Sequence, residues 1–189
     1  MIGVFSAIAA ILMVLEFPVP FAPSFYGLDF SELPALIGAF AYGPVAGVMI
    51  EFCKILIKLV LKPSSTAFVG ELANFSISCM LVLPASVIYL FKKSRKQAIL
   101  GTVVGTLIMT AFGSCFNAIY LLPKFSELYG IPLDAIIGMG TAINPAIHSI
   151  SGLVLMCVVP LNLLKGGLVS LITILVYKKL SPILKAAHK

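Results

Sequence analysis

Long apolar stretches, separated by short polar clusters, make up most of this chain. A helix needs about 20 mainly apolar residues to cross a bilayer, and about 17 is the lower limit. The pattern predicts helices at roughly 2–17, 33–42, 44–61, 69–91, 98–121 and 160–180. The second helix is too short to cross a membrane alone, so we expect it to be tilted, extended or packed inside the bundle.

The stretch before the last expected helix is harder to interpret. Residues 135–164 carry no charge, but Asn144-Pro145 and Val159-Pro160 interrupt them. Proline is favoured at the first position of a helix, so we expect the sixth helix to begin at Pro160. Residues 134–159 should then form short helical pieces at one membrane face, buried in protein or lining a cavity. The predicted fold is all-α: one domain over residues 1–189, with six transmembrane helices and a structured outer loop region.

The composition supports a membrane protein. Hydrophobic residues make up 60% of the chain and charged residues 11%, whereas soluble domains have about 45–50% and about 25%. This excess is too large for a buried core. Residues 1–15 lack the basic region and cleavage site of a signal peptide, so we interpret them as a retained helix.

The positive charges indicate how the helices are oriented. Eight of the 13 Lys and Arg residues lie in two clusters, 92–96 and 178–189. With six helices, both clusters and both termini fall on one face, which the positive-inside rule makes cytoplasmic. Orientation thus explains the net charge of +6 better than a nucleic-acid partner does. The acids Glu16, Asp29, Glu32, Glu127 and Asp134 then lie outside.

Sequence patterns of catalysis are absent. The chain contains no HExxH, GxSxG or Gly-rich phosphate-binding loop, so we do not expect an enzyme. His148 and Ser149 are adjacent, but a local polar pair in a loop explains them. The four cysteines are far apart, which favours small buried side chains over a metal site or disulfides.

The third expected helix carries Glu51, Lys54, Lys58 and Lys62 on one stripe. At 100° per residue the stripe is about 80° wide. Charges at membrane depth usually face the bundle interior or one another. One interpretation is a Glu51–Lys54 pair, with Lys58 and Lys62 reaching outward; another is a charged cavity wall or a coupling element.

Three other expected helices each carry two polar residues at i and i+3 near the outer boundary. The pairs are Glu71 with Asn74, Asn117 with Tyr120, and Asn162 with Lys165. Capping or snorkelling would explain each pair alone. Together they predict a ring of donors and acceptors suited to a flat, polar-edged small molecule.

Small residues line one side of the first expected helix. Gly3 with Ala7, and Ser6 with Ala10, have the small-xxx-small spacing that allows close helix contact in lipid. We interpret these four residues as a candidate interface with a partner subunit.

Four motifs resemble a known family: "LDFSELPALIGAFAYGPVAG", "GELANF", "FNAIYLLP" and "PLNLLKG". They resemble the riboflavin-binding S components of bacterial energy-coupling factor (ECF) transporters, the RibU family. The resemblance runs from about residue 6 to about residue 180.

The resemblance implies a multi-pass protein of the bacterial cell membrane that captures riboflavin from outside, as substrate and not as cofactor. Transport would require a transmembrane coupling subunit and a pair of ATPases. The implied pocket residues are Glu71, Asn74, Asn117, Asn162 and Lys165.

The resemblance also places Asp29 and Glu32 in an outer loop that helps close the pocket. We expect these acids mainly to serve the start of the second helix, with Ser31 as N-cap and ligand contact secondary. The family's coupling motif is Ala-xxx-Ala, which Gly3-xxx-Ala7 or Ser6-xxx-Ala10 would replace.

Three other functions remain open at this point. An S component for another vitamin, such as thiamine or biotin, would share the fold. A membrane enzyme would need a nucleophile and base, and a passive channel would not need converging polar pairs.

Overall fold

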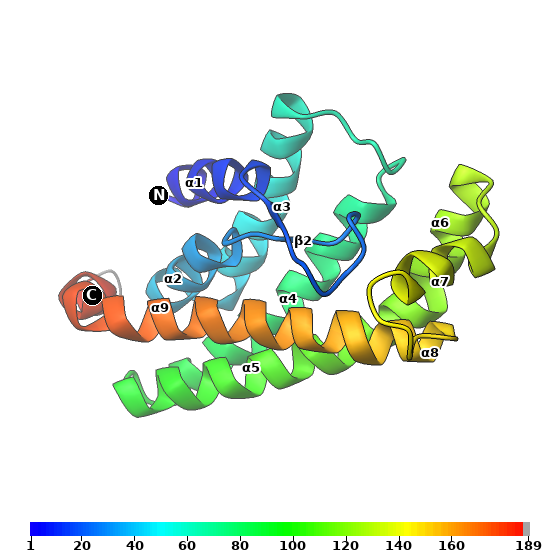
Figure 1. Ribbon diagram of the computed structural model, residues 1–189. Coiled ribbons are helices and arrows are strands. Elements are labelled where there is room, and N and C mark those ends of the chain that lie inside the picture. Colours follow the sequence, from blue (N-terminus) through cyan, green and yellow to red (C-terminus); the bar gives the residue numbers. More distant parts are fainter. Residues whose placement is uncertain (187–189) are drawn as a thin grey trace.

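The computed structural model describes residues 1–186 and is built almost entirely of helices (Figure 1). The longer helices are α1 (Ile2–Val14), α2 (Glu32–Tyr42), α3 (Pro44–Leu61), α4 (Val69–Phe91), α5 (Arg95–Phe116) and α9 (Val159–Ala186). Shorter pieces are the π-helical turn η1 (Asn117–Leu121), α6 (Leu122–Tyr129), α7 (Leu133–Thr141), α8 (Ile150–Leu153) and the π-helical turn η2 (Val154–Val158). The all-α class is confirmed, apart from one two-stranded pair in the segment that joins α1 to α2 (residues 15–31), called the first outer segment here after the side of the membrane expected for it.

That pair joins β1 (Phe17–Pro18) to β2 (Gly27–Leu28) in antiparallel register. It closes a loop rich in proline and aromatic residues that lies beside the first turns of α4 and α9 (Figure 1). A buried apolar cluster holds this loop in place, because Tyr26 and Leu28 pack there with Leu121 and Leu122.

Within the part of the chain that the structure describes, three continuous helical stretches are long and apolar enough to cross a membrane: Val69–Phe91, Arg95–Tyr129 and Ile150–Val176. Helices α1 and α2 are shorter, and α3 carries three charged residues within its 18 positions. The structure thus supports a membrane protein, and the count of six transmembrane helices stays a prediction.

The start of α9 at Val159 lies within one residue of the expected start at Pro160, but no break in the helix precedes it. The helix is continuous from Ile150 through Pro160 because the π-helical turn η2 precedes the proline. A proline ring clashes with the carbonyl of residue i−4 in a regular α-helix. That residue is Met156 for Pro160 and Ile119 for Pro123. Each lies inside a π-helical turn, whose wider spacing of backbone hydrogen bonds accommodates the ring.

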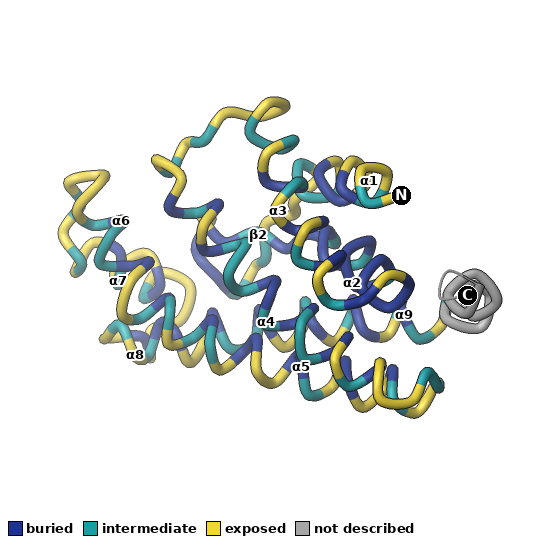
Figure 2. The backbone as a smooth tube through the Cα atoms, turned by 180° about the vertical axis from the view of Figure 1, so that it is seen from behind, coloured by how far each residue is buried: buried dark blue, intermediate teal, exposed yellow. Residues whose placement is uncertain are grey.

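Helix α2 lies inside the bundle, which is one of the three arrangements expected for so short a helix. Eight of its 11 residues are buried, and it packs against α1, α3, α4 and α9 (Figure 2). Gly43 then takes a φ of +94°, which permits the sharp turn into Pro44 at the start of α3.

Close contact between α4 and α5 builds the other side of the bundle. A Cβ at Gly101 or Gly105 would stand 2.5 Å from a backbone oxygen of α4, so the two backbones touch where only glycine fits. Helix α9 packs along α5 in turn. The start of α1, the α4–α5 turn and the end of α9 lie at one end of the molecule, opposite α6, α7 and α8 (Figure 1).

Candidate functional site

A cavity of about 830 Å³ lies below the first outer segment, between α4, η1 and the helix that contains α9. Ligand pockets of small molecules measure about 300–1,000 Å³. Six of the seven predicted site residues line this cavity: Asp29, Glu71, Asn74, Asn117, Asn162 and Lys165. The predicted convergence of polar side chains from separate helices is therefore present.

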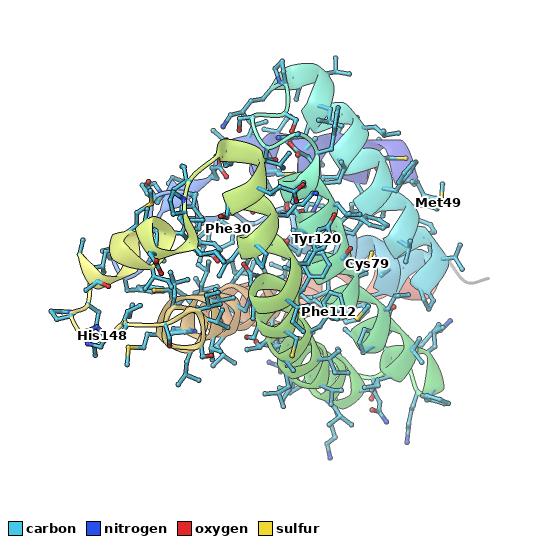
Figure 3. The ribbon with its side chains drawn as sticks, turned by 90° about the vertical axis from the view of Figure 1, so that its right-hand side faces the viewer. Phe30, Met49, Cys79, Phe112, Tyr120 and His148 are labelled. Atoms are coloured by element: carbon cyan, nitrogen blue, oxygen red, sulfur yellow. The ribbon has the colours of Figure 1, made fainter. Side chains whose placement is uncertain are left out.

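Tyr120 is the exception, since it does not line the cavity and is 38% exposed. It belongs to a row of aromatic rings with Phe116 and Phe112 along the same helix (Figure 3). The π-helical turn explains the difference, because its longer period brings residues more than three apart onto one face. Asn117 therefore shares the cavity with Leu121 instead of Tyr120.

Aromatic side chains form much of the outer wall. Phe25 and Tyr26 come from the first outer segment, and Phe125 and Tyr129 from α6. The rings of Phe25 and Phe125 meet edge to face, with centroids 6.1 Å apart. Such a wall suits a flat ring system on a ligand.

Tyr26 connects the outer segment to η1. Its hydroxyl donates to Asn117 Oδ1 at 2.8 Å, and Asn117 Nδ2 donates to the Gly113 carbonyl at 2.7 Å. Burial raises the pKa of Tyr26, so the phenol stays a neutral donor. The amide of Asn117 is thus occupied within the protein, which makes it a support for the outer segment.

Lys165 holds two acids, Asp29 in the first outer segment and Glu32 at the start of α2. Its Nζ lies 2.9 Å from Asp29 Oδ2 and 2.7 Å from Glu32 Oε1. Ser78 on α4 donates to the same Glu32 oxygen at 2.6 Å. Burial alone would raise the pKa of Asp29, but the charges of Lys165 and Lys54 outweigh it and lower that pKa.

Ser31 occupies the expected N-cap position of α2, but its side chain does not cap the helix. Its hydroxyl makes no cap bond to α2 and accepts instead from Lys54 Nζ at 3.0 Å. The Ser31 N–H donates to Asp29 Oδ1 at 2.8 Å, so Asp29 does shape this helix start. Both Ser31 and Lys54 are fully buried, and a buried ammonium needs hydrogen-bond acceptors, so the Ser31 hydroxyl serves Lys54 instead of the helix start.

Glu71 lies nearer the mouth of the cavity. It pairs with Lys58, and accepts from Ser64 at 2.8 Å and Thr66 at 3.0 Å. The expected Glu51–Lys54 pair is confirmed and both side chains are fully buried. Lys58 does not reach outward, as one of the two interpretations had it, because it is largely buried and pairs with Glu71 at the cavity wall.

Two cavity amides keep an unpaired atom. Asn74 Oδ1 and Asn162 Nδ2 are buried and have no hydrogen-bond partner within the part of the chain that the structure describes. An unpaired buried polar atom costs roughly 1–3 kcal/mol. Asn74 and Asn162, which both line the cavity, therefore keep hydrogen-bonding capacity that the protein itself does not use.

The first helix presents only one of its two small-residue pairs. Ser6 and Ala10 are fully buried within the chain, which contradicts their assignment to a partner interface. Gly3 and Ala7 are exposed, and a Cβ at Gly3 would meet nothing within 4 Å. The physical reason is that α1 uses its Ser6–Ala10 face to pack against α2 and α3.

His148 is exposed in the loop after α7, away from the cavity (Figure 3). Ser149 caps α8, since its hydroxyl accepts from the Gly152 N–H at 3.0 Å. Among the described residues, no group of three or more His, Cys, Asp or Glu could hold a metal ion.

Sequence reasoning missed several residues of the cavity. Tyr26 and Phe25 lie in "FAPSFYGLD", where aromatic residues in an outer loop could have suggested a wall. Ser78 and Phe125 gave no usable signal, because a serine or phenylalanine in an apolar helix is common.

Helices suited to a membrane, together with a cavity that offers unpaired amides beside aromatic walls, define a membrane protein that binds a small molecule. Residues 1–177 match the family described as "ECF transporter, substrate-specific component". A solved structure described as "Structure and mechanism of the S component of a bacterial ECF transporter" gives a TM-score of 0.74 at 36% identity, covering 97% of this chain and 95% of that one.

Two relatives show the same likeness over nearly the whole chain. The riboflavin transporter RibU of Staphylococcus aureus (strain TCH60) is 34% identical, over 97% of this chain and 90% of that protein. The riboflavin transporter FmnP of Bacillus subtilis (strain 168) is 31% identical, over 96% and 90%. This chain therefore belongs to the substrate-specific (S) components of ECF transporters.

Proposed function

We propose that this S component captures riboflavin in the cavity and delivers it for uptake by an ECF transporter. The observation that carries the proposal is the pair of unpaired cavity amides, Asn74 Oδ1 and Asn162 Nδ2. The names of the relatives, both riboflavin transporters, support it. Riboflavin is here the transported substrate and no cofactor.

The chemistry of riboflavin fits these amides. One edge of its isoalloxazine ring carries carbonyl oxygens, ring nitrogens and an N–H, and the other end is a dimethylbenzene. Asn162 Nδ2 can donate to a carbonyl, and Asn74 Oδ1 can accept from the ring N–H. The aromatic wall of Phe25 and Phe125 offers flat apolar contact for the rest of the ring.

We further propose that uptake depends on a transmembrane coupling subunit and paired ATPases. The chain has no phosphate-binding loop of its own. The exposed Gly3–Ala7 face of α1 offers a surface for close contact with the coupling subunit in lipid.

In the orientation we propose, six helices lie in the bacterial cell membrane with both termini cytoplasmic. The basic α4–α5 turn lies at the same end as the start of α1, which favours this orientation (Figure 1). The cavity then opens at the outer side, where riboflavin arrives.

An S component for thiamine or biotin is the second candidate, because the fold alone does not select a vitamin. Purified protein would be titrated with riboflavin, thiamine and biotin, and riboflavin alone should bind tightly. Tight binding of thiamine or biotin without riboflavin binding would refute the proposed substrate. Vesicles that also contain the coupling and ATPase subunits should take up riboflavin with ATP, and vesicles with this protein alone should not.

A further inference from the structure

A buried chain of polar contacts leads from α3 to the wall of the cavity. It begins at Glu51 and Lys54, which are both 0% exposed and form an ion pair. Neither residue lines the cavity. The proposed function gives them no role, although a buried ion pair inside a membrane helix is costly to maintain.

The chain of contacts continues through the first outer segment. Lys54 Nζ donates to Ser31 Oγ at 3.0 Å, and Ser31 is itself fully buried. The Ser31 N–H donates to Asp29 Oδ1 at 2.8 Å. One ammonium on α3 therefore fixes the turn that presents Asp29 to the cavity.

The series of polar contacts ends at Lys165 on α9. The Nζ of Lys165 lies 2.9 Å from Asp29 Oδ2 and 2.7 Å from Glu32 Oε1. Both acids and Lys165 line the cavity, whereas Ser31 does not. Displacing residues 29–32 would therefore shift the two acids and the lysine that they hold.

We propose that Lys54 is a positioning residue for the ligand site: through Ser31 it fixes residues 29–32, and these set Lys165 at the cavity wall. The inference rests on the proposed function, since ligand binding is one of its readouts. A merely structural ion pair would stabilise the fold without changing the order of residues 29–32.

Two variants separate these roles. Glu51→Gln with Lys54→Met removes both charges, leaves the net charge unchanged and leaves no buried ion unpaired. Replacing a whole buried pair by neutral residues is often tolerated, so the melting temperature without ligand should stay within about 4 °C. Ser31→Ala removes the acceptor alone and keeps the ion pair. Ser86→Ala is the matched control, because Ser86 is equally buried but donates to Val82 O within α4.

The first readout needs no ligand. Hydrogen exchange of peptides that cover residues 29–32 should be faster in both test variants than in the unmodified protein, and unchanged in Ser86→Ala. Unchanged exchange in Ser31→Ala would overturn the inference, whether or not the double variant folds.

The second readout is riboflavin affinity. We expect about a tenfold loss in both test variants, mostly through faster release, because an ordered wall lowers the cost of binding. Adding Ser31→Ala to the double variant should cause almost no further loss of affinity, since the Ser31 and Lys54 changes remove the same contact. Unchanged affinity in both variants, or an equal loss in Ser86→Ala, would contradict the proposal. If the unmodified protein did not bind riboflavin, the proposed function would fail and the exchange comparison would still decide the inference.

Discussion

The Tyr26 hydroxyl and the Asn117 amide are 91 residues apart in sequence and form a buried hydrogen bond of 2.8 Å. Tyr26 belongs to the first outer segment and Asn117 to the π-helical turn at the cavity. This single contact therefore ties the cover of the cavity to one of its walls.

Tyr26→Phe should destabilise the protein without ligand. The change leaves Asn117 Oδ1 buried without its donor, at a cost of roughly 1–3 kcal/mol. The melting temperature of a chain of this size changes by about 2–4 °C per kcal/mol. The midpoint of thermal unfolding in detergent should therefore fall by several degrees. Tyr42→Phe, at a half-exposed tyrosine of α2, is the control and should leave the midpoint in place. Equal midpoints for all three proteins would contradict a supporting role for Tyr26.

Lys165→Met should be strongly destabilising, because it leaves Asp29 and Glu32 buried without their cation. Removing one partner of a buried pair costs roughly 3–5 kcal/mol. Lys124→Met is the matched control: Lys124 pairs with Glu127 at 2.7 Å on the exposed surface, where an ion pair contributes about 0–1 kcal/mol. Denaturation should separate the two variants, and similar losses would show that Lys165 is not a central support.

The residues of the cavity also show what the sequence could predict. The convergence of Asn74, Asn162 and Lys165 was predictable, because spacing on a helix determines which side chains share a face. The partners of Lys165 were not, since Asp29 lies 136 residues away and no helical period connects them.

The π-helical turns mark a second limit. Proline favours the start of a helix, but Pro160 lies within a continuous helix because η2 accommodates its ring. The same local geometry at η1 removed Tyr120 from the cavity. The small-residue pairs on α1 were equivalent in sequence, and only the packing of α1 distinguished the buried Ser6–Ala10 face from the exposed Gly3–Ala7 face.

The proposed orientation predicts which positions a membrane-impermeant thiol reagent reaches. The exposed native Cys115 would first be replaced by Ser. A cysteine at Lys96, in the first turn of α5, should then react only from the cytoplasmic side, and one at Glu127, in α6, only from outside. Reaction of both positions from one side would overturn the orientation.

Ala7→Leu should weaken assembly with the coupling subunit and leave riboflavin affinity unchanged. A bulky side chain on the Gly3–Ala7 face blocks close helix contact, and Ala7 is exposed and does not line the cavity. Ala111→Leu, an equal change on the exposed face of α5, is the control. Co-purification with the coupling subunit measures the effect. Normal assembly of Ala7→Leu would refute this interface.

The most direct test of the account is a riboflavin titration of the unmodified protein, Asn74→Ala and Asn162→Ala. Asn144→Ala is the matched control, because Asn144 is exposed in the loop after α7 and does not line the cavity. Each cavity change should leave a ligand group unpaired, at a cost of about 1–3 kcal/mol, which is roughly a five- to 150-fold loss of affinity. The account predicts this loss of affinity in both cavity variants. Asn144→Ala should bind riboflavin as tightly as the unmodified protein does. Unmodified affinity in Asn74→Ala and Asn162→Ala would contradict it and place the riboflavin site elsewhere.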